Sequence, residues 1–124
     1  MDVWFGFQLN RKEPVYLQLV RRVKQLLVSG GLQDGELLPS RRETAARLEI
    51  NPNTVQKAYK QLEDEGILST DSGGSRVACP EDTRLRLREE WVREIGAEFV
   101  QNLQNLGFSF KDAVGLLSEL WEES

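Results

Sequence analysis

The side chains best suited to chemistry in this chain are amides, hydroxyls and cations that recur between positions 53 and 61. If residues 52–65 form a helix with its apolar side facing inward, the opposite side presents six polar residues: Asn53, Thr54, Gln56, Lys57, Lys60 and Gln61. Amide and hydroxyl groups match the donors and acceptors on base edges in the major groove of DNA, and cations match phosphates. The alternative is an ordinary solvated helix face, and periodicity alone does not choose between the two.

Three arginines lie in the stretch directly before this segment. Arg41, Arg42 and Arg47 would lie on a preceding helix, on the flank expected to cross a nucleic-acid backbone. The whole chain has a net charge of −4, but residues 11–76 carry +2 and residues 77–124 carry −5. This asymmetry predicts two surfaces with different partners, or else charges that only solvate exposed faces.

Composition argues against most enzyme classes. The 124 residues include no histidine, which removes the commonest general base and the commonest metal ligand. Cys79 is the single cysteine, so the sequence has no intrachain disulfide and no cysteine-rich zinc site. The carboxylates at positions 89, 90, 94 and 98 read as a solvated helix face, because no other ligand type accompanies them. We expect no catalytic residue, no metal and no cofactor.

No targeting or membrane segment is expected either. The first residues lack the basic and apolar regions of a signal peptide. No window approaches the roughly 18 apolar residues of a membrane span. These features predict a cytoplasmic protein that does not associate with a membrane.

Several short signals predict the helices that must position the polar residues. Leu19, Val23 and Leu27 recur at helical spacing, and glycines at positions 30 and 31 end that pattern. Ser40 precedes Glu43 at the spacing of a capping box, which predicts a second helix.

A third helix follows at once. Asn51 and Pro52 mark its start, and Gly66 marks its end. Only two or three residues then separate the second and third helices, which is typical of a helix-turn-helix.

A hairpin is expected directly after these helices. Residues 67–70 and 75–78 flank a turn that contains Gly73 and Gly74, and this predicts the wing of a winged helix. Residues 1–13 alternate weakly between apolar and polar types, which predicts an extended arm. The expected fold is mainly α with a small β-hairpin: a winged helix-turn-helix domain plus two C-terminal helices.

The combined motifs closely resemble one family of DNA-binding proteins. LPSRRETA at residues 38–45, INPNTVQKAY at 50–59 and LEDEG at 62–66 are similar to the DNA-binding domain of GntR-family bacterial transcription regulators. PVYLQL at 14–19 and GLQDG at 31–35 resemble that family's first helix and the turn after it, so the similarity covers residues 9–78. A tail of only two helices is similar to the short YtrA-type subfamily, often encoded beside ABC transporters. The resemblance implies a repressor that binds a palindromic operator as a homodimer, with control of an adjacent ABC-transporter operon.

The resemblance also implies which residues contact double-stranded DNA. Arg42 falls on the family's arginine that contacts phosphate and base. Positions at the start of the recognition helix and at the wing tip follow: Asn51, Asn53, Thr54, Gln56, Lys57, Gly73 and Gly74. This chain departs from the family's wing, since Asp71 lies near the tip and Arg76 stands where an aromatic residue is expected. Arg41 of the second predicted helix and Lys60 of the third, together with Arg76, complete the predicted DNA interface.

Two apolar stripes in the C-terminal segment predict a dimer interface. Their members are Trp91, Ile95, Phe99 and Leu103 on a helix over 82–106, and Phe110, Val114, Leu117 and Trp121 on the last helix. Docking against a second copy would remove this aromatic area from water. The alternative is that both stripes fold back on the winged helix.

These observations define two expected domains and leave two kinds of protein open. Residues 1–79 are expected to bind DNA and residues 80–124 to dimerise. Two helices enclose little volume, so we expect no large metabolite pocket, and the sequence does not identify an effector. The competing reading is a winged-helix adaptor that binds proteins and not DNA.

Overall fold

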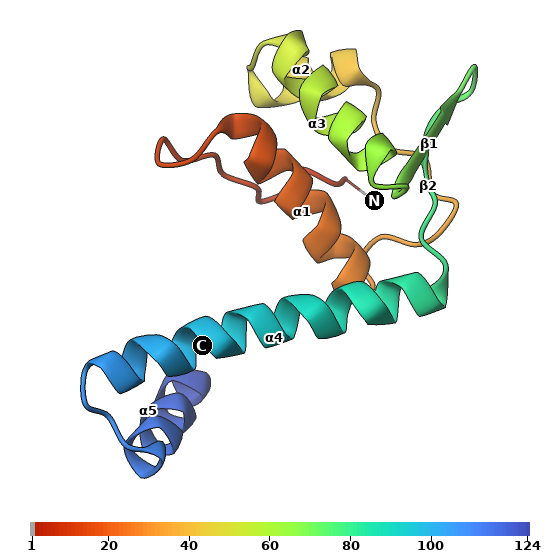
Figure 1. Cartoon of the computed structure of the whole chain (residues 1–124). Helices are drawn as coiled ribbons and strands as arrows, with labels where there is room; N and C mark the ends of the chain where they lie inside the picture. The colour runs from red at the N-terminus through yellow and green to blue at the C-terminus, as the bar shows by residue number, and fades with distance from the viewer. Residues whose placement is uncertain (1) are drawn as a thin grey trace. The chain divides into compact units, whose positions relative to one another are not determined.

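A computed structural model describes residues 2–124 as five helices and one two-stranded antiparallel hairpin (Figure 1). In chain order these are α1 (Val15–Ser29), α2 (Arg41–Leu48), α3 (Pro52–Asp64), β1 (Leu68–Asp71), β2 (Gly74–Val77), α4 (Glu81–Asn105) and α5 (Phe110–Glu123). This confirms the predicted fold class. By its internal contacts the chain divides into two units, residues 1–86 and residues 87–124.

Local capping fixes where the helices begin. The Ser40 hydroxyl accepts a hydrogen bond from the Glu43 amide at 3.0 Å, and the Glu43 carboxylate accepts one from the Ser40 amide. Asn51 caps α3 by accepting from the Asn53 amide at 2.8 Å, with Pro52 in the first helical position. The predicted capping box and the predicted proline start are therefore confirmed.

The first unit has a core built around α3. α1, α2 and β1 all pack against α3. Four α3 side chains are completely buried: Val55, Ala58, Tyr59 and Leu62. Apolar residues from α1 and from the hairpin close the core, namely Leu19, Val23, Leu27, Leu68 and Val77. The spacing of α3 thus turns its apolar side inward and its polar side to solvent.

The prediction of an extended arm at the N-terminus is wrong for residues 3–6, which form turns. Val3 and Trp4 are buried, and Arg22 donates hydrogen bonds to the carbonyl groups of Val3 and Phe5. The Trp4 indole N–H donates to the hydroxyl of Thr44 in α2 at 3.0 Å. Burial of an indole that keeps its hydrogen bond explains why this segment packs and does not extend into solvent.

A chain of buried hydrogen bonds continues from Trp4 into the core. The hydroxyls of Thr44 and Tyr59 are 3.0 Å apart, and Tyr59 donates to the carbonyl of Pro39 at 2.7 Å. An indole N–H only donates and a carbonyl only accepts, so every bond in the chain runs from Trp4 toward Pro39. The N-terminal segment, α2, α3 and the loop before α2 are joined by this relay.

The wing has a tight turn, and a segment outside the hairpin also forms hydrogen bonds with its backbone. Leu68 pairs with Val77 and Asp71 with Gly74, which leaves Ser72 and Gly73 as the turn. The Leu38 amide donates to the Ser75 carbonyl at 2.8 Å, and the Val77 amide donates to the Glu36 carbonyl at 2.8 Å. Backbone bonds therefore anchor the hairpin to the segment before α2.

The second unit contains most of α4 and all of α5, and none of the residues in these helices is buried. The helices agree with the predicted pair. Ten large apolar side chains of residues 87–124 are exposed: Val92, Ile95, Val100, Leu106, Phe108, Phe110, Val114, Leu117, Leu120 and Trp121. Within residues 2–124, no helix is both long enough and apolar enough to cross a membrane.

Candidate nucleic-acid interface

The exposed side of α3 carries the polar residues that the sequence singled out. Asn53, Gln56, Lys57 and Lys60 are exposed, and Thr54 and Gln61 are half-buried. The carboxamide oxygen of Asn51 is occupied by its capping bond, so its NH2 group is what it can offer to a ligand. The first two turns of α3 therefore present amide, hydroxyl and ammonium groups together.

Arg42 is the cation best placed to meet an external anion. It lies in the first turn of α2 and is exposed. Within residues 2–124, its guanidinium has no ion pair and no hydrogen bond. An unpaired guanidinium keeps its full fork of donors for a phosphate or a guanine edge.

Other cations of this region already have partners inside the chain. The ammonium of Lys57 lies 4.0 Å from the centre of the Tyr16 ring, and Arg47 pairs with Asp2 at 2.7 Å. Sequence reasoning missed Tyr16 as a neighbour of α3, because the two residues come from different helices. The ring holds the ammonium close to the start of α1 without neutralising its charge.

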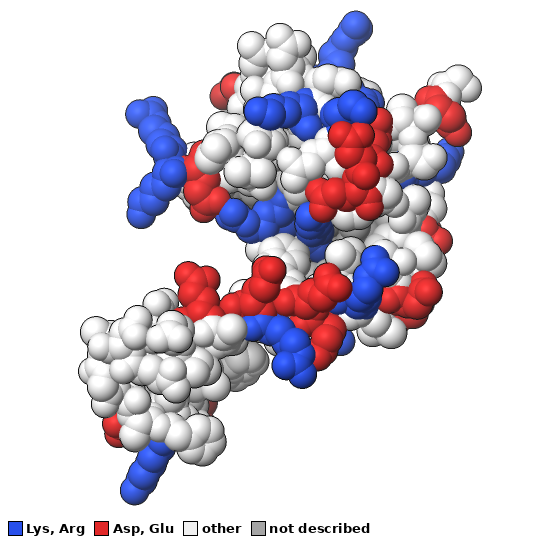
Figure 2. Space-filling model, viewed as in Figure 1, with Lys and Arg blue, Asp and Glu red and all other residues white. Residues whose placement is uncertain are grey.

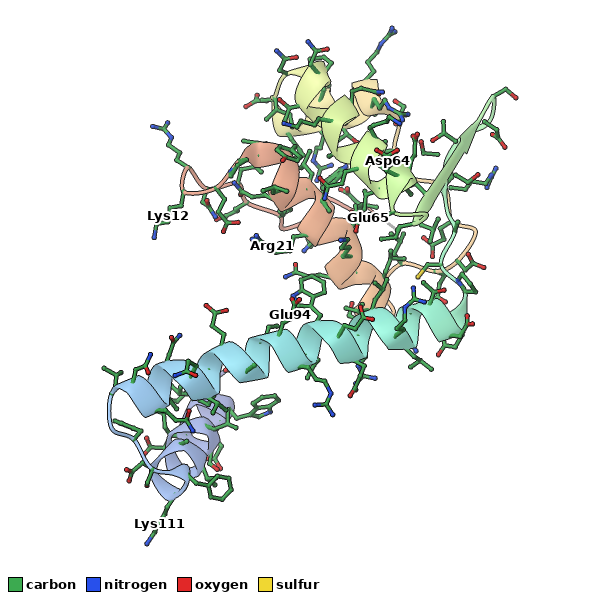
Figure 3. All side chains as sticks on the ribbon, viewed as in Figure 1. Lys12, Arg21, Asp64, Glu65, Glu94 and Lys111 are labelled. Atoms are coloured by element: carbon green, nitrogen blue, oxygen red, sulfur yellow. The ribbon has the colours of Figure 1, made fainter. Side chains whose placement is uncertain are left out.

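Three consecutive acids end α3, and each forms an ion pair. Glu63 pairs with Arg41 at 2.5 Å, Asp64 with Lys60 at 2.9 Å, and Glu65 with Lys24 at 2.6 Å. Figure 3 shows Asp64 and Glu65 together at this end of the helix. The hydrogen bond to Asp64 raises the pKa of Lys60 above its usual value. Negative charge is thus concentrated at the C-terminal end of α3, away from the polar groups of its first two turns.

Arg41 lies between α2, α3 and the wing. In addition to its ion pair with Glu63, it donates to the Ser75 hydroxyl at 3.3 Å and its guanidinium lies 5.1 Å from the centre of the Tyr59 ring. Its side chain is half-buried, whereas that of Arg42 is exposed. A direct contact between Arg41 and DNA remains a prediction.

The wing tip is built from backbone and from Asp71. The Asp71 carboxylate accepts from the Gly73 amide at 2.7 Å, which ties this acid into the turn. Gly74 has φ of 115°, and a Cβ there would lie 3.0 Å from Leu37, so the position requires glycine. Arg76 is exposed and donates to the Gly35 carbonyl at 3.3 Å. Arg76 is the only cation of the wing, residues 68–77.

The predicted dimer residues all lie in α4 and α5. Trp91, Phe99 and Leu103 are half-buried. The other five are exposed, with exposed fractions of 60% for Ile95, 86% for Phe110, 46% for Val114, 44% for Leu117 and 76% for Trp121. Figure 2 also shows acidic side chains gathered along α4. This unit therefore combines uncovered apolar area with negative charge.

Few groups elsewhere suggest chemistry. Among residues 2–124, no three His, Cys, Asp or Glu residues cluster in a way that could hold a metal ion. Cys79 is buried, and burial raises the pKa of its thiol. An open depression of about 560 Å³ lies along α5 and is lined by Phe108, Lys111, Asp112, Gly115, Leu116 and Glu119.

Comparison with known proteins gives a consistent picture. The model for the family "Bacterial regulatory proteins, gntR family" matches residues 15–77. Over 103 residues the chain is 34% identical to the uncharacterized HTH-type transcriptional regulator YhcF of Bacillus subtilis, covering 82% of this chain and 85% of YhcF. Over 60 residues it is 48% identical to the HTH-type transcriptional repressor YtrA of the same species, covering 48% of this chain and 46% of YtrA. A GntR family transcriptional regulator from Listeria monocytogenes superposes with a TM-score of 0.83 at 27% identity, over 90% of this chain and 98% of that one.

These matches confirm the resemblance carried by the motifs between residues 38 and 66. The match with YhcF extends past the winged helix, and the Listeria structure covers nine-tenths of this chain. The protein is a helix-turn-helix transcriptional regulator and not an enzyme. The chain belongs to the gntR family of bacterial regulatory proteins.

Proposed function

We propose that this protein is a transcriptional repressor that binds a palindromic operator in double-stranded DNA as a homodimer. The observation that carries the proposal is the exposed polar half of α3 combined with the guanidinium of Arg42, which has no partner within residues 2–124. A helix of this kind fits the major groove, and a neighbouring arginine can reach the flanking backbone or a base edge.

Each part of the interface has a proposed task. Asn53, Thr54 and Gln56 meet base edges, because amides and hydroxyls can both donate and accept. Arg42 meets a phosphate or a base edge. Other groups at the margins supply phosphate and minor-groove contacts. They are the amide of Asn51, the cations Lys57, Lys60 and Arg76, and the backbone of Gly73 and Gly74.

The C-terminal unit supplies the dimer. Ten large apolar side chains in residues 87–124 are exposed, more than single surface apolar residues explain. A second copy is the proposed occupant, because one winged helix reads too few base pairs and a palindrome needs two. We accordingly propose residues 1–79 as the DNA-binding domain and residues 80–124 as the dimerisation segment.

Repression follows from occupancy of the promoter, and the Bacillus subtilis relative YtrA is named a repressor. The similarity to the YtrA-type subfamily supports an adjacent ABC-transporter operon as the regulated target. This function places the protein in the cytoplasm, with no membrane partner and no cofactor. Any effector would act through the dimer surface or between subunits, because two helices enclose little volume.

Fluorescence anisotropy with duplexes from the region upstream of the protein's own gene tests the proposal. The chain should bind one such duplex much more tightly than a scrambled duplex of equal length at the same salt concentration. Arg42→Ala should weaken operator binding by about 1–3 kcal/mol, because it removes a whole guanidinium contact.

Arg88→Ala is the matched control, since Arg88 is also exposed but lies in the acidic C-terminal unit. It should bind like the unaltered protein. Equal binding by the Arg42→Ala variant would contradict the assignment of Arg42. Failure to bind any upstream duplex would favour the winged-helix adaptor.

A further inference from the structure

We propose that Arg41 is a positioning residue that fixes the wing against the recognition helix α3, and that it does not itself contact DNA. The proposal rests on the DNA-binding function proposed above. It assigns different tasks to two adjacent arginines that the sequence presents as equivalent. It also identifies Glu63, Thr70 and Ser75 as the groups through which Arg41 acts.

Arg41 and Glu63 form an ion pair between α2 and α3. The terminal nitrogen of Arg41 lies 2.5 Å from the Glu63 carboxylate, and both side chains are only about a quarter exposed, at 28% and 26%. The guanidinium also lies 5.1 Å from the centre of the Tyr59 ring. A half-buried charged hydrogen bond with a cation–π contact is stronger than a surface ion pair.

Hydrogen bonds connect this pair to the wing. Arg41 donates to the Ser75 hydroxyl in β2 at 3.3 Å, and Thr70 in β1 donates to the Glu63 carboxylate at 2.7 Å. The hydroxyls of Thr70 and Ser75 are 2.8 Å apart. The four side chains therefore form a closed ring of hydrogen bonds that joins α2, α3, β1 and β2.

Arg41 would lose several contacts by turning toward DNA. It would break the bond to Glu63, the bond to Ser75 and the contact with Tyr59. Its Nε atom is buried, so this part of the side chain is packed inside the protein, although the Nε–H makes no hydrogen bond within residues 2–124. Arg42 has nothing comparable to lose, because its guanidinium is exposed and has no partner among residues 2–124.

A wing held against α3 changes how the protein binds DNA. A wing that is hydrogen-bonded to α3 moves with it, so contacts of the two elements in neighbouring grooves occur together. Without Arg41, the wing still packs through Leu68 and Val77 and keeps its backbone bonds to Glu36 and Leu38, but it loses the side-chain hydrogen bond from α2 to Ser75. Operator binding, which needs both elements in register, should suffer more than binding to unrelated DNA.

The test uses full-length Arg41→Ala, Arg41→Lys and Glu63→Gln variants. Each should weaken operator binding about five- to tenfold and leave the slope of log affinity against log salt unchanged, because no phosphate contact is lost. Lysine keeps the charge but not the fork of donors, so Arg41→Lys should resemble Arg41→Ala. The double variant Arg41→Ala, Glu63→Gln should be no weaker than Arg41→Ala alone. Asp64→Asn controls for the loss of an acid beside Glu63.

A second readout does not need DNA. Amide hydrogen exchange of the wing, residues 68–77, should speed up in the Arg41 variants and in Thr70→Val, which breaks the ring without touching the Arg41–Glu63 pair. Circular dichroism should show an unchanged helix content, which separates this effect from unfolding.

Several results would overturn the proposal. One is a fall of about one unit in the salt slope for Arg41→Ala, which is the signature of a lost phosphate contact. Another is tighter operator binding by Glu63→Gln than by Asp64→Asn, which would mean that Glu63 restrains an arginine meant for DNA. Unchanged amide hydrogen exchange of the wing in all variants would also contradict the proposal. If the unaltered protein binds no upstream duplex, the proposed function fails, while the exchange experiment still decides the role of Arg41.

Discussion

Arg41 and Arg42 are adjacent in sequence, yet their surroundings give them different chemistry. The guanidinium of Arg41 is shared among Glu63, Ser75 and Tyr59, whereas that of Arg42 is exposed and unpaired in the described part of the chain. Successive residues of a helix point about 100° apart, so one of two neighbours faces the core while the other faces solvent. Fewer cations are therefore available to bind DNA than the sequence contains. A cation that is held by a partner inside the protein is less available than an exposed cation such as Arg42.

Lys60 illustrates how such a partner should change DNA binding. Its pair with Asp64 joins two exposed side chains, so it contributes little to stability. The pair raises the pKa of Lys60, so it favours the charged ammonium. We predict that Lys60→Gln weakens binding to all duplexes similarly and lowers the salt slope by about one unit.

Asp64→Asn should strengthen binding to all duplexes similarly, because it removes a charge that repels phosphate and releases Lys60 from its ion pair. Salt titrations of anisotropy with operator and scrambled duplexes check both variants. Loss of operator binding alone by Lys60→Gln would show that Lys60 reads a base and not a phosphate.

At the scale of elements, α3 is held at one end and free at the other. Lys24 of α1 and Arg41 of α2 pair with the acids at its C-terminal end, while its first two turns keep their polar groups exposed. This division leaves the first turns free to enter a groove. It also keeps the carboxylates of the last turn away from the phosphates.

The sequence predicted these elements because their signals are local. A capping box at Ser40, a proline after Asn51 and a glycine turn in the wing each act within four residues. The missed features join distant positions: Trp4 bonds to Thr44 across 40 residues, and Arg41 to Glu63 across 22. Such pairs depend on how helices pack, which apolar spacing does not specify. The residues of α3 that face solvent were predictable, but the partners of their cations were not.

The Trp4 segment gives a stability prediction at this scale. Trp4→Phe removes the indole N–H and leaves the Thr44 hydroxyl without its donor, inside a buried relay. We expect the free energy of unfolding to fall by about 1–3 kcal/mol. Urea unfolding followed by circular dichroism measures it.

Phe5→Ala is the matched control for Trp4→Phe, because Phe5 is the next residue but its side chain is 75% exposed. Its effect should stay within about 0.5 kcal/mol. Equal effects of the two substitutions would mean that the segment does not pack as described.

At the scale of the molecule, the two units differ in charge and in burial. Residues 11–76 carry +2 and enclose a core, whereas residues 77–124 carry −5 and their helices contain no buried residue. Apolar area left in water costs roughly 25 cal/mol per Å² relative to burial. Helices with this much exposed apolar area gain stability from a partner, and their acidic surface is unsuited to contact with DNA. Both features support the proposal that this unit joins two copies while the other unit binds the operator.

The dimer proposal predicts the behaviour of a full-length variant with two charges in the tail, Ile95→Glu and Leu117→Glu. Both side chains are exposed within one chain, so the substitutions should leave the winged helix folded. Between two copies they would place carboxylates in an apolar interface, and desolvation of these charges should drive dissociation. We expect sedimentation as a monomer and operator affinity reduced at least tenfold, because the second half-site then binds independently. Phe5→Glu adds a charge at an exposed apolar residue of the other unit and should leave the dimer intact. Sedimentation of the double variant as a dimer would place the interface outside these two helices.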